Sequence, residues 1–409
     1  MNRTIAVVIA ALVAVLAAVG LLTGGEGSDS EPSARSAGPS IAQVARGVER
    51  VRELKFERLP RVERVTGEQA AAAGLRELDR DLPRADVLAE ERLLKLLHLL
   101  PPKSGLRELL GKALSTEVGG YYLPRTRTLS IVGGGGQLGL LGEITLAHEL
   151  THALEDQHFG IESRGSTGFR RDREVADSAL REGSATVAMV DYAVLEETGT
   201  ANVPAQLRGR ALRALDDAAV PASSGLPRYV RESLVFPYAA GARLVNRIQG
   251  RGGWEAVNRA FGADAPVSSE QVMHPAKYDA RERPVRVRVT GLRSALPAGA
   301  RPVEEGDFGE FDTEQLLRAA NGRERSAAAA AGWGGGGFSL WRLGTDRYAL
   351  ALRWAWDSAR DAREFERAAR RTARSLGGAA VARRGRTVAL ALAPERARAE
   401  ALVQRALPE

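Results

Sequence analysis

The strongest constraint on the fold of this chain is the segment TLAHELTHALEDQHFG, residues 145–160, which contains three of its five histidines. Its apolar residues recur with helical spacing and predict one helix over residues 138–157. On that helix His148 and His152 lie one turn apart on the same face, so that both imidazoles can reach a single ion. Glu149 lies roughly a quarter of a turn round from His148 and can reach a water on that ion. The order H-E-x-x-H is the arrangement that binds zinc through two histidines and uses the glutamate as general base.

The chain has no cysteine, which excludes disulfide bonds and thiolate ligands. A catalytic zinc site needs a third protein ligand and keeps a fourth position for water. One candidate is His158, which stands where the pattern H-E-x-x-H-x-x-G-x-x-H has its last histidine, and VMHP at residues 272–275 could form the accompanying methionine turn. That pattern requires glycine at the position of Glu155, however. A glutamate there favours a continued helix, which would carry His158 away from the metal.

The other candidate is Glu182, on a helix predicted over residues 173–198. A carboxylate on a second helix, packed antiparallel against the first, gives the His₂Glu ligand set of thermolysin. We prefer Glu182, and His158 would then cap the helix or support a ligand. Small residues that would let the second helix approach the metal closely flank Glu182: Ala179, Gly183, Ser184 and Ala185.

Four segments, in this order, resemble a family of exported bacterial zinc metallopeptidases of the gluzincin type: YYLPRTRTLSIVG, LAHELTHALEDQHF, REGSATVAMVDY and VSSEQVMHPAKY. In that family H-E-L-T-H-A-L-x-D-Q-H-F precedes an E-G-x-A-T helix. The resemblance covers roughly residues 119–278, and AAAGWGG and WDSARDAREF are similar to the family's C-terminal part. It implies a zincin-like domain in which His148, His152 and Glu182 bind zinc and Glu149 is the base.

One position departs from thermolysin-like gluzincins, which carry an aspartate four residues after the ligand glutamate to orient a zinc histidine. In this chain that position is Thr186. Asp156, Asp177 or Thr186 could supply the orienting hydrogen bond instead, and the sequence leaves the three open.

The expected reaction is hydrolysis of a peptide or protein substrate, with Glu149 as general base toward a water that zinc activates. The oxyanion needs a further donor. His274 and Tyr278, in the loop PVSSEQVMHPAKY, suit that role, and a purely structural role for His274 is an equal alternative. The strand predicted over residues 128–132 is a candidate edge strand that could bind an extended peptide by β-augmentation.

The N-terminal region places one arginine before an uninterrupted apolar run from Ile5 to Leu22. This pattern predicts a signal peptide or an N-terminal membrane anchor over residues 1–23. The stretch that follows is rich in glycine, serine, glutamate and proline and predicts a flexible linker over residues 24–40. We therefore expect an extracytoplasmic protein, either secreted or anchored to the cell membrane through residues 5–22.

The composition, 44% hydrophobic and 27% charged, is that of a soluble globular protein. The net charge of +7 could suggest an acidic partner. The arginines are scattered among aspartate and glutamate, however, and no dense basic run alternates with aromatic residues. We therefore expect no binding of nucleic acid.

The pattern as a whole predicts an α+β fold that is mainly helical. A zincin-like catalytic domain is expected over residues 41–305, with a small edge β-sheet formed by a strand within residues 56–67 and a hairpin over residues 119–136. A small C-terminal α+β module is expected over residues 306–409. Besides the two helices of the proposed site, helices are predicted at residues 41–54, 68–100, 204–218, 233–249 and 358–376.

Two functions compete at this point. The first is an exported zinc metallopeptidase, and the alternative is a catalytically inactive zincin-like scaffold or binding protein of the cell envelope. Glu149 favours the enzyme, because a scaffold needs no base beside its metal. The C-terminal module has no catalytic constellation and is expected to pack or to bind. In that module Trp354 and Trp356, two residues apart on a strand, should point to one face.

Overall fold

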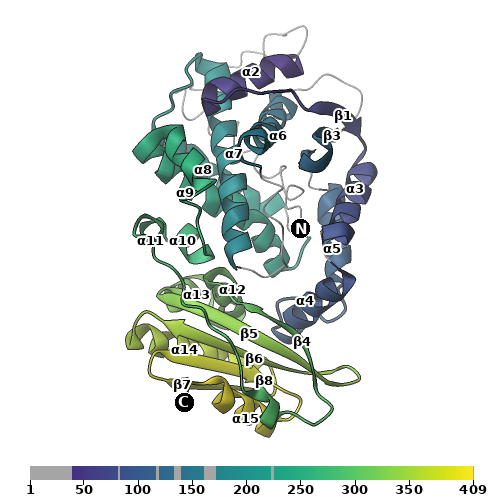
Figure 1. Ribbon diagram of the computed structural model, residues 1–409, viewed down its shortest axis with the longest axis vertical. Helices are drawn as coiled ribbons and strands as arrows, with labels where there is room; N and C mark the ends of the chain where they lie inside the picture. The colour runs from purple at the N-terminus through teal and green to yellow at the C-terminus, as the bar shows by residue number, and fades with distance from the viewer. Residues whose placement is uncertain are drawn as a thin grey trace. The chain divides into compact units, whose positions relative to one another are not determined.

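The computed structural model describes residues 39–81, 83–116, 119–132, 140–160, 172–222 and 225–408. The expected signal peptide or anchor over residues 1–23 and the linker up to residue 38 lie outside the described residues. Within the described ranges, no helix has the length and apolar character needed to cross a membrane. The fold is mixed α+β with helix predominating, as the sequence predicts (Figure 1).

Contacts within the chain divide it into two compact units. The first comprises the described residues up to Asp81 and those within Arg107–Ser166 and Asp177–Pro266. The second comprises the described residues of Leu82–Leu106, Thr167–Ala176 and Val267–Glu409.

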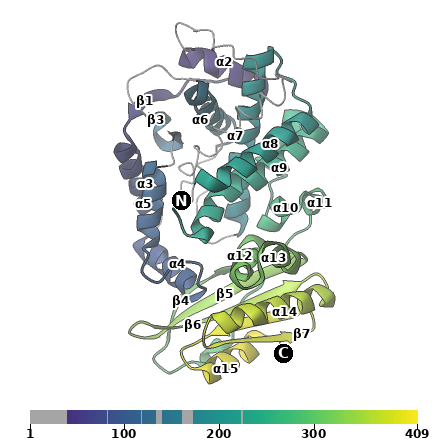
Figure 2. The same cartoon turned by 180° about the vertical axis from the view of Figure 1, so that it is seen from behind.

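Seven helices are described in the first unit, wholly or in large part. Helix α2 begins with a capping box in which Ser40 and Gln43 exchange backbone and side-chain hydrogen bonds. Helices α8 and α9 run side by side (Figure 2). The helices span α2 (Ile41–Arg52), α3 (Gly67–Asp81), α5 (Leu106–Thr116), α6 (Leu140–Phe159), α7 (Asp172–Thr198), α8 (Ala205–Ala222) and α9 (Arg228–Ala260).

One predicted helix is divided. The sequence predicts a single helix over residues 68–100, but α3 ends at Asp81 and α4 (Arg84–Leu96), in the second unit, begins after Pro83. Pro83 has no N–H to donate and is the residue before α4, with an extended ψ of 140°. Apolar periodicity continues across this break, which is why it predicts one helix.

The sheet of the first unit contains β1 (Arg61–Val65), β2 (Gly120–Leu123) and β3 (Thr128–Val132) in the order β1-β3-β2. Strands β2 and β3 form the predicted hairpin, closed by Pro124 in a 3₁₀ turn, η2 (Pro124–Thr126), and by Arg127 with positive φ. Strand β1 pairs in parallel with the other side of β3. The prediction that residues 128–132 form an edge strand is therefore wrong, because both sides of β3 carry a partner. Of the three strands, β1 and β2 are the edges.

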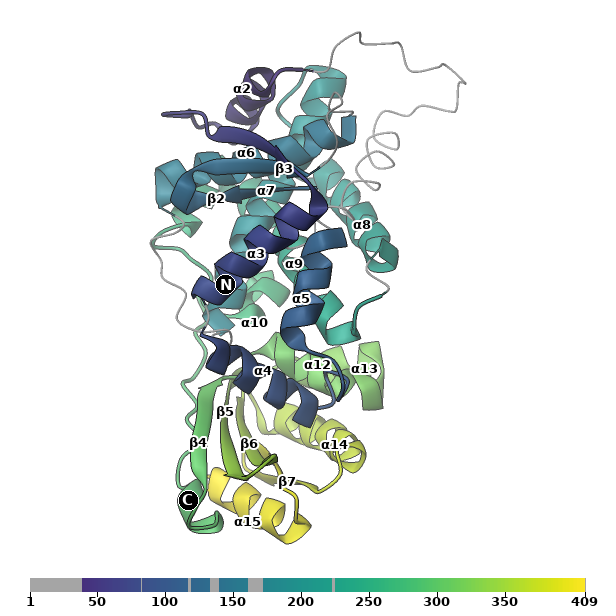
Figure 3. The same cartoon turned by 90° about the vertical axis from the view of Figure 1, so that its right-hand side faces the viewer.

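The second unit is built on an antiparallel sheet in the order β4-β5-β6-β8-β7. Side chains alternate across it. Helices α14 and α15 pack against the sheet (Figure 3). Trp354 of β6 contacts Phe365 of α14, and by alternation Leu350 and Leu352 share its face, whereas Ala349 and Ala351 pack with α15. The strands are β4 (Arg301–Asp307), β5 (Trp333–Gly344), β6 (Arg347–Trp356), β7 (Ala379–Arg384) and β8 (Thr387–Leu392). The helices, besides α4, are α10 (Ser269–Met273), α11 (Pro275–Asp279), η4 (Leu292–Ala295), α12 (Glu310–Asn321), α13 (Arg323–Ala330), α14 (Ala359–Ser375) and α15 (Arg396–Ala406).

Trp354 and Trp356 are buried in the core beneath α14. Their rings lie 4.7 and 4.5 Å from the ring of Phe365, measured between centroids. The glycine run in β5 makes room for the backbone of the segment that contains Val285 and Val287. A Cβ atom on Gly335 would lie 2.2 Å from Val285 O, and one on Gly337 would lie 2.3 Å from Val287 O, so only glycine lets that segment cross β5.

Strand β4 includes the expected domain border at residue 306. Its sequence, RPVEEGD, is mostly charged because β4 is an exposed edge strand, and this hides its strand character in the sequence.

Asp172 is buried at the start of α7, in the part of that helix that belongs to the second unit. Its Oδ2 accepts from Ser269 N at 3.1 Å, and Ser269 Oγ accepts from Phe311 N at 3.2 Å. Burial raises the pKa of Asp172 from 3.8 to about 7. The folded protein thus keeps a proton on Asp172 at pH values where the unfolded chain has released it.

This proton predicts a pH dependence of stability. Because the folded state binds more protons between about pH 4 and pH 7, the free energy of unfolding should fall as pH rises through that window. Asp172→Asn cannot ionise but can still accept from Ser269, so it should remove this fall and be more stable than wild type at pH 8, by a few kcal/mol at about 1.4 kcal/mol per pKa unit. Denaturant unfolding at a series of pH values measures both proteins. Parallel profiles would contradict the assignment.

Candidate metal centre

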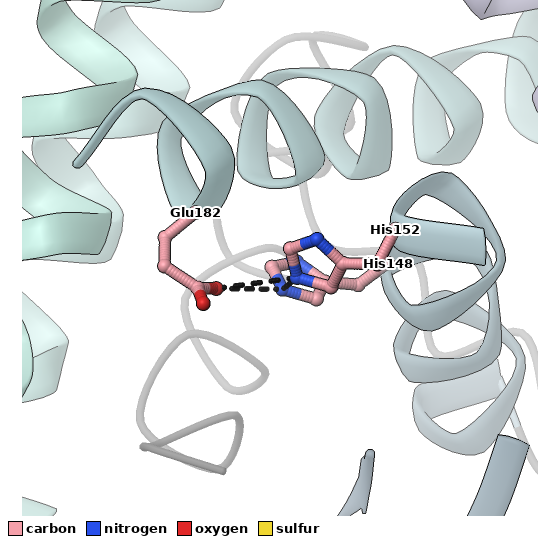
Figure 4. A group of neighbouring side chains, drawn as sticks. All are labelled: His148, His152 and Glu182. Carbon is pink, nitrogen blue, oxygen red and sulfur yellow. Dashed lines mark hydrogen bonds and ion pairs between the residues drawn. The ribbon is translucent and has the colours of Figure 1, made fainter. Parts of the chain in front are cut away.

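Three buried side chains from two helices converge in the first unit. The imidazoles of His148 and His152 on α6 point toward the carboxylate of Glu182 on α7 (Figure 4). His148 Nε2 and His152 Nε2 lie 3.1 Å apart, and each lies 3.3 Å from Glu182 Oε2. The structure thus brings together the three residues that the sequence suggests as ligands, each at most 4% exposed.

This donor set fits a zinc ion. Zinc bonds of about 2.0–2.1 Å in tetrahedral geometry place neighbouring donor atoms about 3.3 Å apart, which is close to the three separations measured here. Two imidazole nitrogens and one carboxylate oxygen are also among the ligands that zinc prefers. His148, His152 and Glu182 can therefore hold one zinc ion with little rearrangement.

The electrostatics of the three groups also favour a cation. Burial lowers the pKa of His148. For His152 burial is outweighed by the negative charge of Glu182, which raises the pKa to about 9. For Glu182 burial is outweighed by His152, which lowers the pKa to about 2. Without a metal the carboxylate is thus ionised and retains a proton on a histidine, and a bound metal would displace that proton.

Glu149 lies beside this cluster and is 1% exposed. One side of its carboxylate accepts from the backbone N–H of Tyr122 in β2, while Oε2 has no hydrogen-bond partner within the described part of the chain. Burial raises the pKa of Glu149 to about 8. A carboxylate with an unpaired oxygen and a pKa near neutrality is suited to accept and release a proton.

Helix α7 is held by a very close contact with α9. A Cβ atom on Gly241 would lie 1.9 Å from Ala179 O, and one on Gly183 would lie 2.2 Å from the carbonyl carbon of Gly241. Ala179 and Gly183 are two of the small residues expected to let α7 approach the metal. At this crossing the absence of side chains on Gly183 and Gly241 lets the backbone of α7 touch that of α9, on which Tyr238 lies one turn before Gly241.

Tyr238 is a residue of the site that the sequence analysis missed. Its ring stacks on the imidazole of His148, with 5.9 Å between centroids and 23° between planes, and its hydroxyl hydrogen-bonds to Glu182. Burial and the charge of Glu182 raise the pKa of Tyr238 well above its ordinary value, so the hydroxyl remains a donor. The only signal in the sequence is the small-residue run AAGA that follows Tyr238, a counterpart to the small residues around Glu182.

The residues that follow the H-E-x-x-H pattern attach α6 to the segment after α2. His158 Nε2 donates to Lys55 O at 2.8 Å, so His158 supports the fold and lies outside the metal cluster. The side chain of Gln157 accepts from the backbone N–H groups of Glu57 and Arg58 and donates to Arg58 O. Helix α6 continues through Glu155 to Phe159, as the absence of glycine there predicts.

Two of the three residues considered for orienting a zinc histidine make other hydrogen bonds. Asp156 Oδ2 accepts from Tyr122 Oη at 3.0 Å, and Thr186 Oγ1 donates to Glu182 O at 2.7 Å. Thr186 therefore bonds to the backbone of the ligand residue and not to a histidine. Asp177 is on α7, one turn and a half before Glu182.

His274 and Tyr278 belong to the second unit, whereas the metal cluster is in the first. His274 Nε2 donates to Glu310 Oε1 at 2.7 Å, and this hydrogen bond raises the pKa of His274. Tyr278 is on α11. In the same unit the carboxylates of Glu270, Glu282 and Asp357 lie close enough together to hold a cation. The ammonium of Lys277 forms an ion pair with all three, so a cation already neutralises this group.

Comparison with known proteins reaches only the second unit. A family model described as a domain of unknown function (DUF8575) matches residues 297–406, a range that contains the five-stranded sheet and runs to the end of α15. No curated protein and no solved structure matches the chain. The metal cluster of the first unit lies outside the matched range.

The geometry of the cluster predicts which variants lose metal. His148→Ala, His152→Ala and Glu182→Ala each delete one of three protein ligands and should abolish tight zinc binding. His158→Ala should leave tight binding largely intact, because His158 donates to Lys55 O and not to a ligand. Even a lost hydrogen bond to a ligand typically costs only about 10–100-fold in metal affinity. Elemental analysis and chelator competition on each purified variant measure this. A collapse of zinc affinity in His158→Ala with full affinity in Glu182→Ala would reverse the ligand assignment.

Proposed function

We propose that this protein is an extracytoplasmic zinc metallopeptidase with a zincin-like catalytic unit. The observation that carries the proposal is the buried His₂Glu cluster with Glu149 beside it. A structural zinc site has four protein ligands and no need of a base. Three ligands together with a carboxylate that has a free oxygen support catalysis instead. The extracytoplasmic location is proposed from the apolar run over residues 5–22.

The chemistry assigned to the protein's own residues is proton transfer. When bound, a zinc ion would lower the pKa of a water molecule and polarise the carbonyl of a peptide bond. Glu149 takes the proton of the attacking water on its unpaired Oε2 and passes it to the leaving amine. Tyr122 N–H holds the other oxygen of that carboxylate.

An extended substrate would bind along β2 and not along β3, the strand that the sequence suggests for this role. Of the strands described, β2 pairs with β3 alone, and its outer edge is the one that donates Tyr122 N–H to Glu149. Gly120 lies in the same strand, and a Cβ atom there would be 3.4 Å from Glu149 Cγ, so the strand runs directly beside the base. A peptide added to this edge beyond Tyr122, whose N–H is bonded to Glu149, would lie beside the proposed base.

The oxyanion of the tetrahedral intermediate needs a donor in addition to the metal. We assign this role to Tyr238, whose hydroxyl already lies at hydrogen-bond distance from the ligand Glu182 and retains its proton. His274 and Tyr278, the donors expected from the sequence, remain candidates from the second unit, and His274 is engaged by Glu310.

The base is tested by Glu149→Gln. The variant keeps the three ligands and the hydrogen bond from Tyr122, so it should bind zinc normally, and turnover should fall by about 10²–10⁴-fold because a positioned base is lost. Hydrolysis of a mixed peptide library, read by mass spectrometry with and without chelator, measures activity. Unchanged hydrolysis would refute the mechanism. A wild-type protein that binds zinc and cleaves no peptide would favour the inactive scaffold.

The oxyanion donor is tested by Tyr238→Phe, which keeps the ring against His148 and removes only the hydroxyl. We expect kcat to fall by about 10²–10³-fold, the usual cost of losing one oxyanion donor, with little change in KM. His274→Ala is the matched comparison and should leave kcat nearly unchanged. The reverse result, a large loss in His274→Ala and none in Tyr238→Phe, would move the donor to the second unit.

A further inference from the structure

Glu155 connects the two helices that carry the metal ligands. It lies three residues after His152 on α6 and is 0% exposed. Its Oε1 accepts from Ser184 Oγ at 2.5 Å, and Ser184 lies two residues after Glu182 on α7. The same oxygen accepts from Arg52 Nε at 2.8 Å. One carboxylate oxygen thus joins α6, α7 and α2 within one helical turn of the metal cluster.

Arg52, the last residue of α2, is fully buried with Glu155. Its guanidinium lies over the ring of Trp254 on α9, at 4.3 Å from the centroid. Arg52 Nη1 and Nη2 and Glu155 Oε2 have no hydrogen-bond partner among the residues that the structure describes. Desolvating such a pair costs about as much as its attraction returns, and apolar residues of equal volume are often more stable. Stability alone is therefore a weak reason for burying this pair beside the metal ligands.

The position of the two contacts on α7 gives a stronger reason. Successive residues of a helix turn by about 100°, so Glu182 and Ser184 leave nearly opposite sides of α7. Glu182 reaches the histidines from one side, while Ser184 is bonded to Glu155 from the other. Two contacts on opposite sides fix both the distance of α7 from α6 and its rotation about its own axis. That rotation decides whether the Glu182 carboxylate meets the two imidazoles.

We propose that Glu155, held by Arg52 and bonded to Ser184, is a positioning residue for the metal centre. The inference rests on the proposed metal binding by His148, His152 and Glu182. It makes α2 part of the functional unit, because the last residue of that helix anchors the carboxylate that aligns the ligand helices. Gln157 and His158 secure the same arrangement by holding the residues that follow Arg52 against α6.

Ser184→Ala tests the inference with the least disturbance, since it removes one hydroxyl and leaves the Arg52–Glu155 ion pair intact. Ser178→Ala is the matched control, because Ser178 is another buried serine on α7 and makes no hydrogen bond with Glu155. Zinc dissociation constants come from chelator competition, and the visible spectrum of the Co²⁺-loaded protein reports coordination geometry. Thermal unfolding of the metal-free proteins measures stability separately.

We expect zinc affinity to fall about 10–100-fold in Ser184→Ala, the usual cost of losing a group that orients a ligand. The Co²⁺ spectrum should shift, and Ser178→Ala should match wild type in both readouts. A purely structural role would lower only the unfolding temperature of metal-free Ser184→Ala. Wild-type zinc affinity and an unchanged Co²⁺ spectrum in Ser184→Ala would therefore overturn the inference.

Arg52 provides a second, independent test. Arg52→Lys keeps a cation near Glu155, whereas Arg52→Met leaves the buried carboxylate unpaired, which should also lower stability. We expect zinc affinity to decrease in the order wild type, Arg52→Lys, Arg52→Met. Where Arg52→Met does not fold, the lysine variant and Ser184→Ala decide the question, and wild-type zinc affinity in both would refute the role of Glu155. Failure of the proposed metal site is seen separately, as wild-type protein that binds no zinc.

Discussion

The contact of α7 with α9 at Gly183 and Gly241 is the constraint on which the site depends. Helices that carry side chains at a crossing stay about 8–10 Å apart, and here the missing side chains allow backbone to touch backbone. This approach places Glu182 on α7 and Tyr238 on α9 against the same imidazole of His148. A methyl group at either glycine would separate the helices and, with them, the carboxylate and the hydroxyl that surround the proposed zinc ion.

The local part of the site could be predicted from the sequence, because His148, Glu149 and His152 are placed by helix geometry alone. Glu182 could be predicted as the third ligand from a second helix whose small residues flank the glutamate. Tyr238 could not be found in this way. Its place depends on how α9 crosses α7, and the sequence around it, FPYAAGARL, carries no spacing that refers to α6. The role of His158 could not be predicted either. Its partner is the backbone carbonyl of Lys55, and no pattern of side chains in the sequence indicates that contact.

In the fold, the types of element were more predictable than their arrangement. The pair Tyr121-Tyr122, the turn residue Pro124 and the run Thr128–Val132 predict the β2–β3 hairpin, and the sequence of residues 56–67 predicts the strand that the structure forms as β1. No local pattern states that β1 pairs in parallel with β3, because that pairing joins residues far apart in the chain, and it turns the expected edge strand into a central one. Likewise β4 was hidden by its charged, exposed sequence, and Pro83 divides a helix whose apolar spacing continues across it.

The segment from His148 to Phe159 contains two separable sets of residues on one helix. The first half carries the two histidines of the metal cluster. In the second half Glu155 bonds to α2 and α7, Asp156 bonds to β2, and Gln157 and His158 bond to the segment after α2. Under the proposed function the first half supplies the chemistry, whereas the second half holds the neighbouring segments in place and, through Glu155, aligns the two ligand helices. A relative without the proposed catalysis would be free to change His148 and Glu149 while keeping E-D-Q-H. A search for divergent relatives should therefore weight the second half of the motif at least as heavily as H-E-x-x-H.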